Sequence, residues 1–334
     1  MKAVLLTAAG GPEVLQVTEV EVPKLPEPNF IRVRLHAAGI NPVDYKLRNK
    51  GGFAPDNLPK ILGCDGAGVV DIVGEAVTRF KPGDEVYFFN GGLGLDEPGN
   101  YAEYTVIHQD YAALKPQNIS MAEAAALPLA WITAWEALVD RAQLQAGQTV
   151  LISAGAGGVG HLAIQLAKKL GARVAATVSN QEKAKFVRSL GAEHWIDYTQ
   201  INFVQAILDW TDGLGAEVIF DTVGGDSFCR SIAATRVYGK VVTLLEHPCD
   251  ASSIKMAKLH NLSLIYELML TPTLQGMQIA RIAQRVMLEE ANCMIAANEL
   301  QVTVSQELPL SQVAKAHRLI EAGHTIGKIV LKII

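Results

Sequence analysis

The sequence has few cysteines, no long apolar run and no cluster of basic residues. Its four cysteines, Cys64, Cys229, Cys249 and Cys293, show no C-x-x-C spacing, which argues against a structural zinc site and against a disulfide framework. We therefore expect reduced thiols. No apolar run reaches the roughly 20 residues that a membrane-spanning helix needs, and the amino terminus lacks a signal sequence. These absences predict a cytoplasmic protein without a membrane partner.

Charge is low and of mixed sign. The formal net charge is −5, and charged residues make up 19% of the chain. A basic stripe of the kind that binds nucleic acid is missing, so the composition favours chemistry on small molecules. With 334 residues, 49% of them apolar, the chain is expected to form about two domains.

Short strands dominate the first part of the chain. They are separated by Pro and Gly clusters, a pattern that predicts an all-β or partly open barrel rather than a second nucleotide-binding fold. The expected strands are Lys2–Thr7, Leu15–Val20, Phe30–Ala38, Gly66–Val73, Glu85–Phe89 and Tyr101–Ile107. A last apolar strand, Ile329–Ile333, needs a sheet to join, and this barrel is the obvious host. The β domain is therefore expected to be discontinuous.

A strand, a glycine turn, a helix and a second strand follow one another between Thr149 and Ser179. The turn fits G-x-G-x-x-G inside a βαβ unit of about 30 residues, which is the pattern of a dinucleotide site. Its glycines permit a tight turn, close approach to a pyrophosphate and close helix packing, and the helix amides point at the diphosphate. The residues expected to meet the dinucleotide are Gly155, Gly157, Gly158, Val159 and Gly160.

Strands continue to alternate with helices after this unit, which predicts a doubly wound parallel sheet of the α/β class. The expected strands are 193–197, 217–221, 239–244 and 262–270, and the expected helices are 203–211 and 227–234. An Ala-rich helix, 121–138, precedes the unit, with a capping box at Ser120 and a break near Pro128. The tail adds helices over 274–291 and 311–322 and a strand over 301–306.

The end of the second strand indicates which dinucleotide binds. An NAD site places an Asp or Glu there to bind the ribose 2′-hydroxyl, but this strand ends at Ser179. Ser179 and Lys183 could instead bind a 2′-phosphate. Glu182 is counter-evidence, although it resembles an ordinary acid in the first turn of a helix. These residues favour NADPH.

Several motifs together are similar to those of the medium-chain dehydrogenase/reductase superfamily, in order and in spacing over the whole chain. They are Gly10–Leu15, Gly39–Asp44, Leu62–Gly68, Lys81–Val86, Ala125–Pro128, Ala156–Gly160, Asp221–Gly224 and Gly327–Val330. The resemblance implies a GroES-like, partly open β-barrel catalytic domain (1–122 and 271–334) and a Rossmann NADP-binding domain with a doubly wound parallel sheet (123–270). It also implies a ligand cleft between the domains.

The ligands of the zinc members are missing from this sequence. Zinc alcohol dehydrogenases carry a Cys where this chain has Asn41 and a His-Glu pair where it has Cys64 and Asp65. One thiol cannot hold a catalytic zinc ion, which needs three protein ligands. The sequence thus resembles the zinc-free quinone oxidoreductase and enone (alkenal) reductase branch, and we expect no metal site. Cys64 is expected to act as a small buried hydrophobic residue.

Within this branch, the resemblance implies two catalytic candidates. Asn41 would lie beside the nicotinamide ribose and the substrate, although a turn residue ahead of Pro42 is an equally good interpretation. Tyr45 could donate a hydrogen bond to the substrate oxygen, although an aromatic residue packed with its hydroxyl satisfied is the more common case. Asp44 and Lys46 are expected at the solvated surface.

The resemblance also implies cofactor contacts outside the glycine turn. Tyr198 would lie beside the 2′-phosphate with Ser179 and Lys183, and Thr133 would face the cleft unless it bonds its own helix backbone. The cofactor-binding residues expected outside the turn are Asn41, Thr133, Ser179, Lys183, Tyr198, Val223, Leu244 and Lys328.

The sequence thus predicts a zinc-independent reductase that transfers a hydride from NADPH to quinones or α,β-unsaturated carbonyls. Such acceptors are already electrophilic and do not need a Lewis acid. An alcohol or aldehyde dehydrogenase-like enzyme and an NADPH-binding sensor with little turnover remain alternatives. Pairing of strand 262–270 with its copy in a second chain would give a homodimer.

Overall fold

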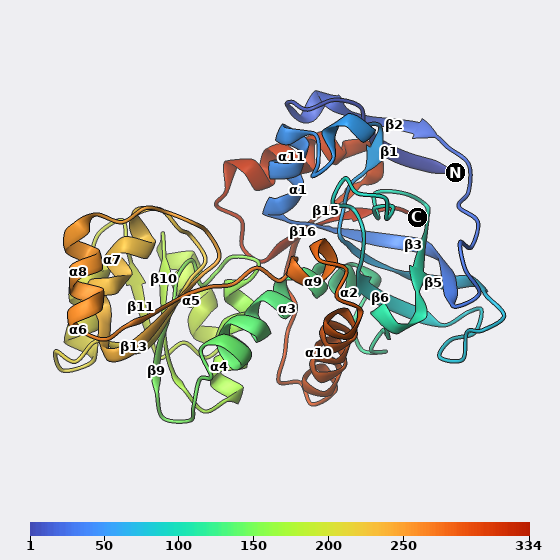
Figure 1. Ribbon diagram of the computed structural model, residues 1–334. Coiled ribbons are helices and arrows are strands. Elements are labelled where there is room, and N and C mark those ends of the chain that lie inside the picture. The colour runs from blue at the N-terminus through green and yellow to red at the C-terminus, as the bar shows by residue number, and fades with distance from the viewer. The chain divides into compact units, whose positions relative to one another are not determined.

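The computed structural model describes residues 1–334, all of the chain, and divides it into two compact units (Figure 1). The first unit is discontinuous and consists of Met1–Ala130 and Pro272–Ile334. The second unit is the uninterrupted segment Trp131–Thr271. The first unit has two sheets and the second has one, and each unit has its own apolar core.

The first unit contains a seven-stranded sheet of order β15-β16-β3-β5-β6-β8, with β7 paired to β3, and a three-stranded sheet of order β2-β1-β4. The strands are β1 (Lys2–Leu6), β2 (Leu15–Glu19), β3 (Phe30–Ile40), β4 (Lys60–Ile61), β5 (Asp65–Val73), β6 (Glu85–Phe89), β7 (Tyr104–His108), β8 (Ala112–Leu114), β15 (Val304–Pro309) and β16 (Lys328–Lys332). The terminal strand β16 pairs antiparallel with β3 and parallel with β15. This confirms that the last strand joins the sheet of the first third.

The helices of the first unit follow the expected signals with two differences. They are α1 (Pro42–Lys50), α2 (Met121–Ala126), α10 (Gln278–Ala296) and α11 (Val313–Ala322), and α3 (Pro128–Trp135) and α9 (Thr271–Leu274) cross the unit boundaries. Ser120 and Glu123 form the expected capping box, and Pro128 breaks the helix as expected. Helix α1 is not among the expected elements; Asn41 is its N-cap and Pro42 its first helical residue. Helix α10 begins four residues later than expected.

The second unit is a doubly wound parallel sheet, as predicted. Its strand order is β11-β10-β9-β12-β13-β14, and every pair is parallel, which is the Rossmann order. The strands are β9 (Thr149–Ile152), β10 (Arg173–Val178), β11 (His194–Asp197), β12 (Ala216–Asp221), β13 (Thr235–Thr243) and β14 (Ser263–Tyr266). The helices are α4 (Gly160–Lys169), α5 (Gln181–Ser189), α6 (Phe203–Trp210), α7 (Asp226–Ala234) and α8 (Ala251–Leu259).

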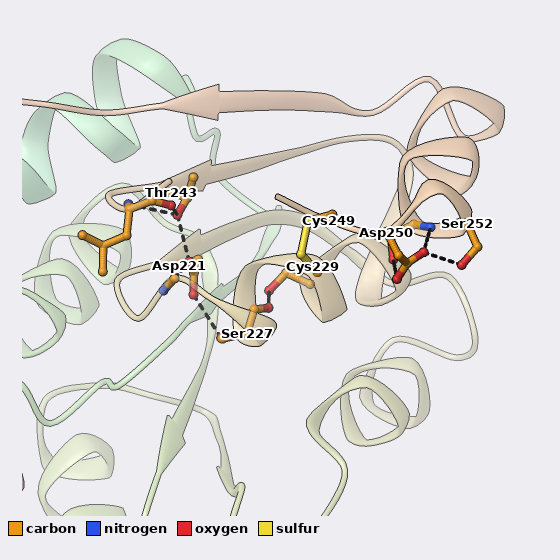
Figure 2. Close-up of a disulfide and its surroundings, with 11 residues drawn as sticks. Asp221, Ser227, Cys229, Thr243, Cys249, Asp250 and Ser252 are labelled. Carbon is orange, nitrogen blue, oxygen red and sulfur yellow. Dashed lines mark hydrogen bonds between the residues drawn. A yellow bond between two sulfur atoms is a disulfide. The ribbon is translucent and has the colours of Figure 1, made fainter. Parts of the chain in front are cut away.

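Two expectations for this unit need correction. The edge strand β14 is shorter than the 262–270 expected, because Glu267 leaves the ladder after its amide bonds the Thr243 carbonyl. The thiols are not all reduced, because Cys229 and Cys249 form a disulfide (Figure 2). Cys64 and Cys293 are free. The fold brings α7 close to the start of α8, and spacing in the sequence cannot show such proximity.

None of the helices combines the length and the apolar character needed to cross a bilayer.

Candidate cofactor and active site

The glycine turn lies at the carboxyl end of β9, between this strand and α4. Ala154 adopts a left-handed backbone conformation at φ 48°. Its amide donates to the Thr177 hydroxyl at 2.9 Å, and the Gly155 amide donates to the Thr177 carbonyl at 2.9 Å. These bonds attach the turn to β10 and fix where α4 begins. Ligands of open parallel sheets bind at this carboxyl edge.

The three glycines of the motif have different surroundings. A Cβ on Gly155 would lie 2.7 Å from the Ala176 Cβ, and one on Gly160 would lie 2.8 Å from the Gly155 Cα and closer still to the Ala154 carbonyl oxygen. Gly157 has more room, with the Ala154 oxygen at 3.2 Å. Gly155 and Gly160 are therefore required by packing. Gly157, Gly158 and Val159 are partly exposed and form the face of the turn that a diphosphate can approach.

The residues expected at the 2′-phosphate follow two adjacent strands. Val178 of β10 pairs with Asp197 of β11, and the Tyr198 amide donates to the Val178 carbonyl at 3.1 Å. Ser179 and Tyr198 therefore leave the sheet side by side at its carboxyl edge. Tyr198 is half-exposed, and no carboxylate occupies the position of Ser179.

Lys183 belongs to the same region. Its amide donates to the Asn180 side chain, which is the N-cap of α5. Lys183 is half-buried, and this burial lowers the pKa of its ammonium while the neighbouring Glu182 carboxylate opposes the change. Glu182 is exposed in the first turn of α5, as expected.

Asp221 organises the next two strand ends. It is buried at the end of β12 and accepts hydrogen bonds from the Gly224 amide at 2.9 Å, the Ser227 hydroxyl at 3.0 Å and the Thr243 hydroxyl at 2.9 Å (Figure 2). It thereby fixes the two connections that carry Val223 and Leu244. Val223 is half-exposed and Leu244 is half-buried.

A buried polar cluster occupies the first unit, where Asn41, Asp65 and Lys328 meet. The Asn41 Nδ2 donates to Asp65 Oδ2 at 2.8 Å, and the Lys328 Nζ donates to Asn41 Oδ1. The Lys328 ammonium also pairs with Asp65 Oδ2 at 3.7 Å. Both ends of the Asn41 amide are thus used, and its orientation is fixed. Lys328 is the buried first residue of β16.

Asp44 and Tyr101 extend this cluster. Asp44 Oδ2 accepts hydrogen bonds from the backbone amide of Asn41 at 2.8 Å and from the Tyr101 hydroxyl at 2.8 Å. Asp44 Oδ1 accepts one from the Cys64 thiol at 3.7 Å. Asp44 is fully buried, so the expectation of a solvated residue was wrong. Its place at the third position of α1 lets it close a capping box with Asn41. Cys64 is fully buried, as expected.

Burial dominates the ionisation of the cluster. It raises the pKa of Asp44 to about 7, against the stabilising hydrogen bonds from the Asn41 amide and Tyr101. It also raises the pKa of Asp65 and lowers that of Lys328, and their mutual attraction opposes both changes. Burial and the two nearby carboxylates raise the pKa of the Cys64 thiol. Cys64 therefore stays protonated at neutral pH and is a poor nucleophile.

Comparison with known proteins agrees with this architecture. Residues 27–117 match the alcohol dehydrogenase GroES-like domain, and residues 190–331 match the zinc-binding dehydrogenase family. Over 330 residues the chain is 34% identical to a quinone oxidoreductase of Pseudomonas aeruginosa, with 99% of each chain covered. The chain belongs to the medium-chain dehydrogenase/reductase superfamily, in its quinone and enone oxidoreductase branch.

Two further relatives come from different sources. The chain is 36% identical over 340 residues to the chloroplastic NADPH-dependent alkenal/one oxidoreductase of Arabidopsis thaliana, covering 99% of this chain and 79% of the relative. The solved structure of the Escherichia coli quinone oxidoreductase complexed with NADPH has a TM-score of 0.88 and 31% identity, with 100% of both chains covered.

In this superfamily member the former zinc position does not suit a metal ion. Asp65 is already engaged by Lys328, by Asn41 and by the Leu129 amide, which donates to Oδ1 at 2.9 Å. The Lys328 ammonium would repel a cation, and the single thiol donates to Asp44. The structure contains no group of three or more His, Cys, Asp or Glu side chains that could hold a metal ion.

The other candidates of the superfamily pattern are distributed as follows. Tyr45 and Lys46 are half-buried on α1, next to the fully buried Asp44. Burial lowers the pKa of the Lys46 ammonium, and the nearby Lys50 lowers it further. Thr133 is buried on α3. In the first turn of this helix, the Leu129 amide donates a hydrogen bond to Asp65 Oδ1.

Sequence reasoning missed the roles of Asp65 and Tyr101. Asp65 stands in an otherwise apolar stretch that continues into β5, and Tyr101 precedes β7. A carboxylate within an apolar strand is a usable signal, because such a group is almost never fully buried unless it is paired. No sequence pattern shows that its partner is Lys328, which lies near the other end of the chain.

Proposed function

We propose that this chain is an oxidoreductase that transfers a hydride from NADPH to quinones or α,β-unsaturated carbonyls without a metal ion. The observation that carries the proposal lies at the carboxyl edge of the second unit. There the glycine turn after β9, whose open face suits a diphosphate, lies next to the end of the adjacent strand β10, and Ser179 at that end is not a carboxylate. The names of the relatives support the same reaction, because they include quinone oxidoreductases and an NADPH-dependent alkenal/one oxidoreductase.

The second unit would hold the cofactor. The exposed face of Gly157, Gly158 and Val159 would approach the diphosphate, and Ser179, Lys183 and Tyr198 would bind the 2′-phosphate. Val223 and Leu244 would line the rest of the cofactor from the ends of β12 and β13. When bound, NADPH supplies the hydride, so the protein contributes binding, orientation and electrostatics.

The first unit would supply the groups for the substrate. Asn41 is held by Asp65 and Lys328 in one orientation, which suits a residue that positions the cofactor ribose and the acceptor. Tyr45 would donate a hydrogen bond or a proton to the oxygen on which negative charge develops. Thr133 and Lys328 complete the proposed set, Thr133 beside the cofactor and Lys328 through its hold on Asn41.

The test is cofactor oxidation by purified, metal-stripped protein with NADPH or NADH, against an ortho-quinone, a short enone and a saturated aldehyde. Turnover with NADPH and either of the first two acceptors supports the proposal. Turnover of the aldehyde alone indicates an alcohol dehydrogenase-like enzyme. NADPH binding without reduction of any acceptor indicates a sensor, and either of these two outcomes contradicts the proposal.

We also propose that the two units correspond to a GroES-like catalytic domain and a Rossmann cofactor domain, and that the enzyme works as a homodimer in the cytoplasm, where NADPH is available. The dimer proposal rests on β14, which pairs with β13 on one side and has no partner strand on the other. Tyr266 and Leu268 are 58% and 51% exposed near this edge. The Glu267 amide donates to the Thr243 carbonyl, so the amide two residues earlier also faces β13, while the Tyr266 amide faces the free edge. Light scattering should give twice the chain mass, and Tyr266→Pro, which removes that free amide, should reduce it to the monomer. A monomeric wild type would disprove the dimer.

A further inference from the structure

The disulfide holds one end of a connection at the carboxyl edge of the second unit. Cys229 lies in the first turns of α7, and Cys249 directly precedes Asp250, the N-cap of α8 (Figure 2). Both cysteines are partly exposed, and both pack against the apolar core formed around Leu151 and Phe228. The pair therefore lies at the margin of the core and not inside it.

The other end of this connection is held by Asp221. Thr243, the last residue of β13, donates its hydroxyl to Asp221, and the Leu244 amide donates to the Asp221 carbonyl at 3.2 Å. Residues 246–248 are exposed, and no hydrogen bond joins them to the rest of the unit. The connection 244–249 is thus anchored at its start by Asp221 and at its end by the disulfide.

This connection belongs to the edge that carries the glycine turn. The sheet order places β9, β12 and β13 side by side, so the glycine turn, the Val223 loop and connection 244–249 emerge from successive strands at the same edge. Ligands of open parallel sheets bind there. The conformation of 244–249 therefore bears on nucleotide binding, and Leu244 is one of the residues assigned to the cofactor.

We propose that Cys229–Cys249 is a redox site that exchanges with dithiol reductants, and that the oxidised form holds connection 244–249 in its nucleotide-binding conformation. In reducing compartments, disulfides are usually transient, catalytic or redox-sensing, which fits a bond placed beside a binding edge. Reduction would free the end of the connection at Cys249, and the ordering of 244–249 would then oppose nucleotide binding.

A dithiol of the thioredoxin or dithiothreitol class supplies the two electrons and two protons that reduction of the disulfide requires. One thiolate of the reductant attacks a sulfur of the pair, the Cys229–Cys249 bond breaks, and the released thiolate takes up a proton. The second thiol of the reductant then displaces the mixed disulfide. Two electrons and two protons pass to the protein, and the reductant leaves as its own disulfide. A small-molecule disulfide reverses the reaction.

The experiment compares oxidised and reduced wild type by three measurements. Thiol titration of the unfolded protein should give two free thiols before reduction and four after it. Hydrogen exchange in residues 244–250 of the nucleotide-free protein should become faster on reduction. The Kd for NADPH, measured by fluorescence titration, should rise roughly fivefold or more and return when the pair is reoxidised.

Cys229→Ser and Cys249→Ser should behave like reduced wild type under either condition. Cys293→Ser, which removes the exposed free thiol of the first unit, should respond to reduction as the wild type does. Four free thiols after treatment with a small-molecule disulfide, or unchanged exchange and Kd after complete reduction, would overturn the proposal. The Kd measurement rests on the proposed function, whereas the exchange measurement does not. The two results can therefore be separated. If the protein binds NADPH in neither state but its hydrogen exchange in 244–250 becomes faster on reduction, NADPH binding and its dependence on the disulfide are refuted. The effect of the disulfide on connection 244–249 is then still established.

Discussion

The glycine turn of the second unit and the buried cluster of the first unit are built in opposite ways. The turn is continuous in sequence, and its backbone amides are the groups that would meet a ligand. Steric contacts restrict which residues it tolerates, since Gly155 and Gly160 have no room for a Cβ. The cluster combines side chains from the start of α1, from β5 and from β16 with that of Tyr101. Electrostatic pairing restricts which residues it tolerates. A backbone site depends on local geometry, whereas a buried polar site depends on complete pairing.

The difference predicts how each region fails. Loss of one partner in the cluster leaves a buried charge without compensation and affects the stability of the unit. A methyl group on the open face of the turn obstructs the ligand and leaves the fold intact.

The largest effect is expected for Lys328→Met. It leaves the Asp65 carboxylate buried without its ammonium, which should cost about 3–5 kcal/mol of unfolding free energy. Lys332→Met, on the exposed end of the same strand, is the matched control and should cost under about 0.5 kcal/mol. Urea denaturation measures both. Equal stability of the two variants would mean that the Lys328–Asp65 pair does not stabilise the unit.

Two alanine variants separate packing from binding within the turn. Gly160→Ala should lower both stability and NADPH affinity, with a stability loss of about 1–3 kcal/mol, because its Cβ meets the backbone of the turn. In Gly157→Ala the methyl group lies 3.2 Å from the Ala154 oxygen, a tight contact but a longer one than at Gly160. This variant should lose less stability than Gly160→Ala, while NADPH affinity falls roughly tenfold or more. Thermal unfolding and fluorescence titration measure the two quantities. Normal NADPH affinity in Gly157→Ala would rule out the assigned diphosphate face.

The raised pKa of Asp44 should make the free energy of unfolding depend on pH. Its pKa is about 7 in the folded chain, against an ordinary value of 3.8, so the folded state holds an extra proton between these values. The stability from this proton is complete below pH 3.8 and is lost as pH rises through 7, with a slope of at most about 1.4 kcal/mol per pH unit. Denaturation at several pH values should show this slope in wild type and in Asp56→Asn, an exposed control, but not in Asp44→Asn. An unchanged slope in Asp44→Asn would contradict the assignment.

The smallest effect concerns the choice of cofactor. Ser179→Asp places a carboxylate at the end of β10, where it should repel the 2′-phosphate and accept from a ribose hydroxyl. The kcat/KM for NADPH should fall about tenfold, which is about 1.4 kcal/mol, while that for NADH should hold or rise. Ser189→Asp, at the exposed end of α5, should change neither value. If Ser179→Asp leaves the ratio of the two cofactors unchanged, Ser179 does not face the 2′-phosphate.

The sequence predicted the local features well and the distant ones poorly. The glycine turn, the parallel sheet and the capping box at Ser120 depend on residues close in the chain, and the structure confirms them. The buried position of Asp44 is not predictable, because nothing near it in sequence reveals that the Tyr101 hydroxyl donates to it. The Cys229–Cys249 bond was missed for the same reason, since only the packing of α7 beside α8 brings the two residues together.

Transfer of deuterium from labelled cofactor tests the central claim most directly. NADPH labelled at C4 on either face is incubated with the enzyme and a short enone, and the product is analysed by mass spectrometry. The account predicts that one of the two labels, and only one, appears at the β-carbon of the saturated product, since a bound cofactor presents a single face to the acceptor. Product without label from either cofactor, or no product from the enone and from an ortho-quinone alike, would contradict hydride transfer from NADPH to activated acceptors.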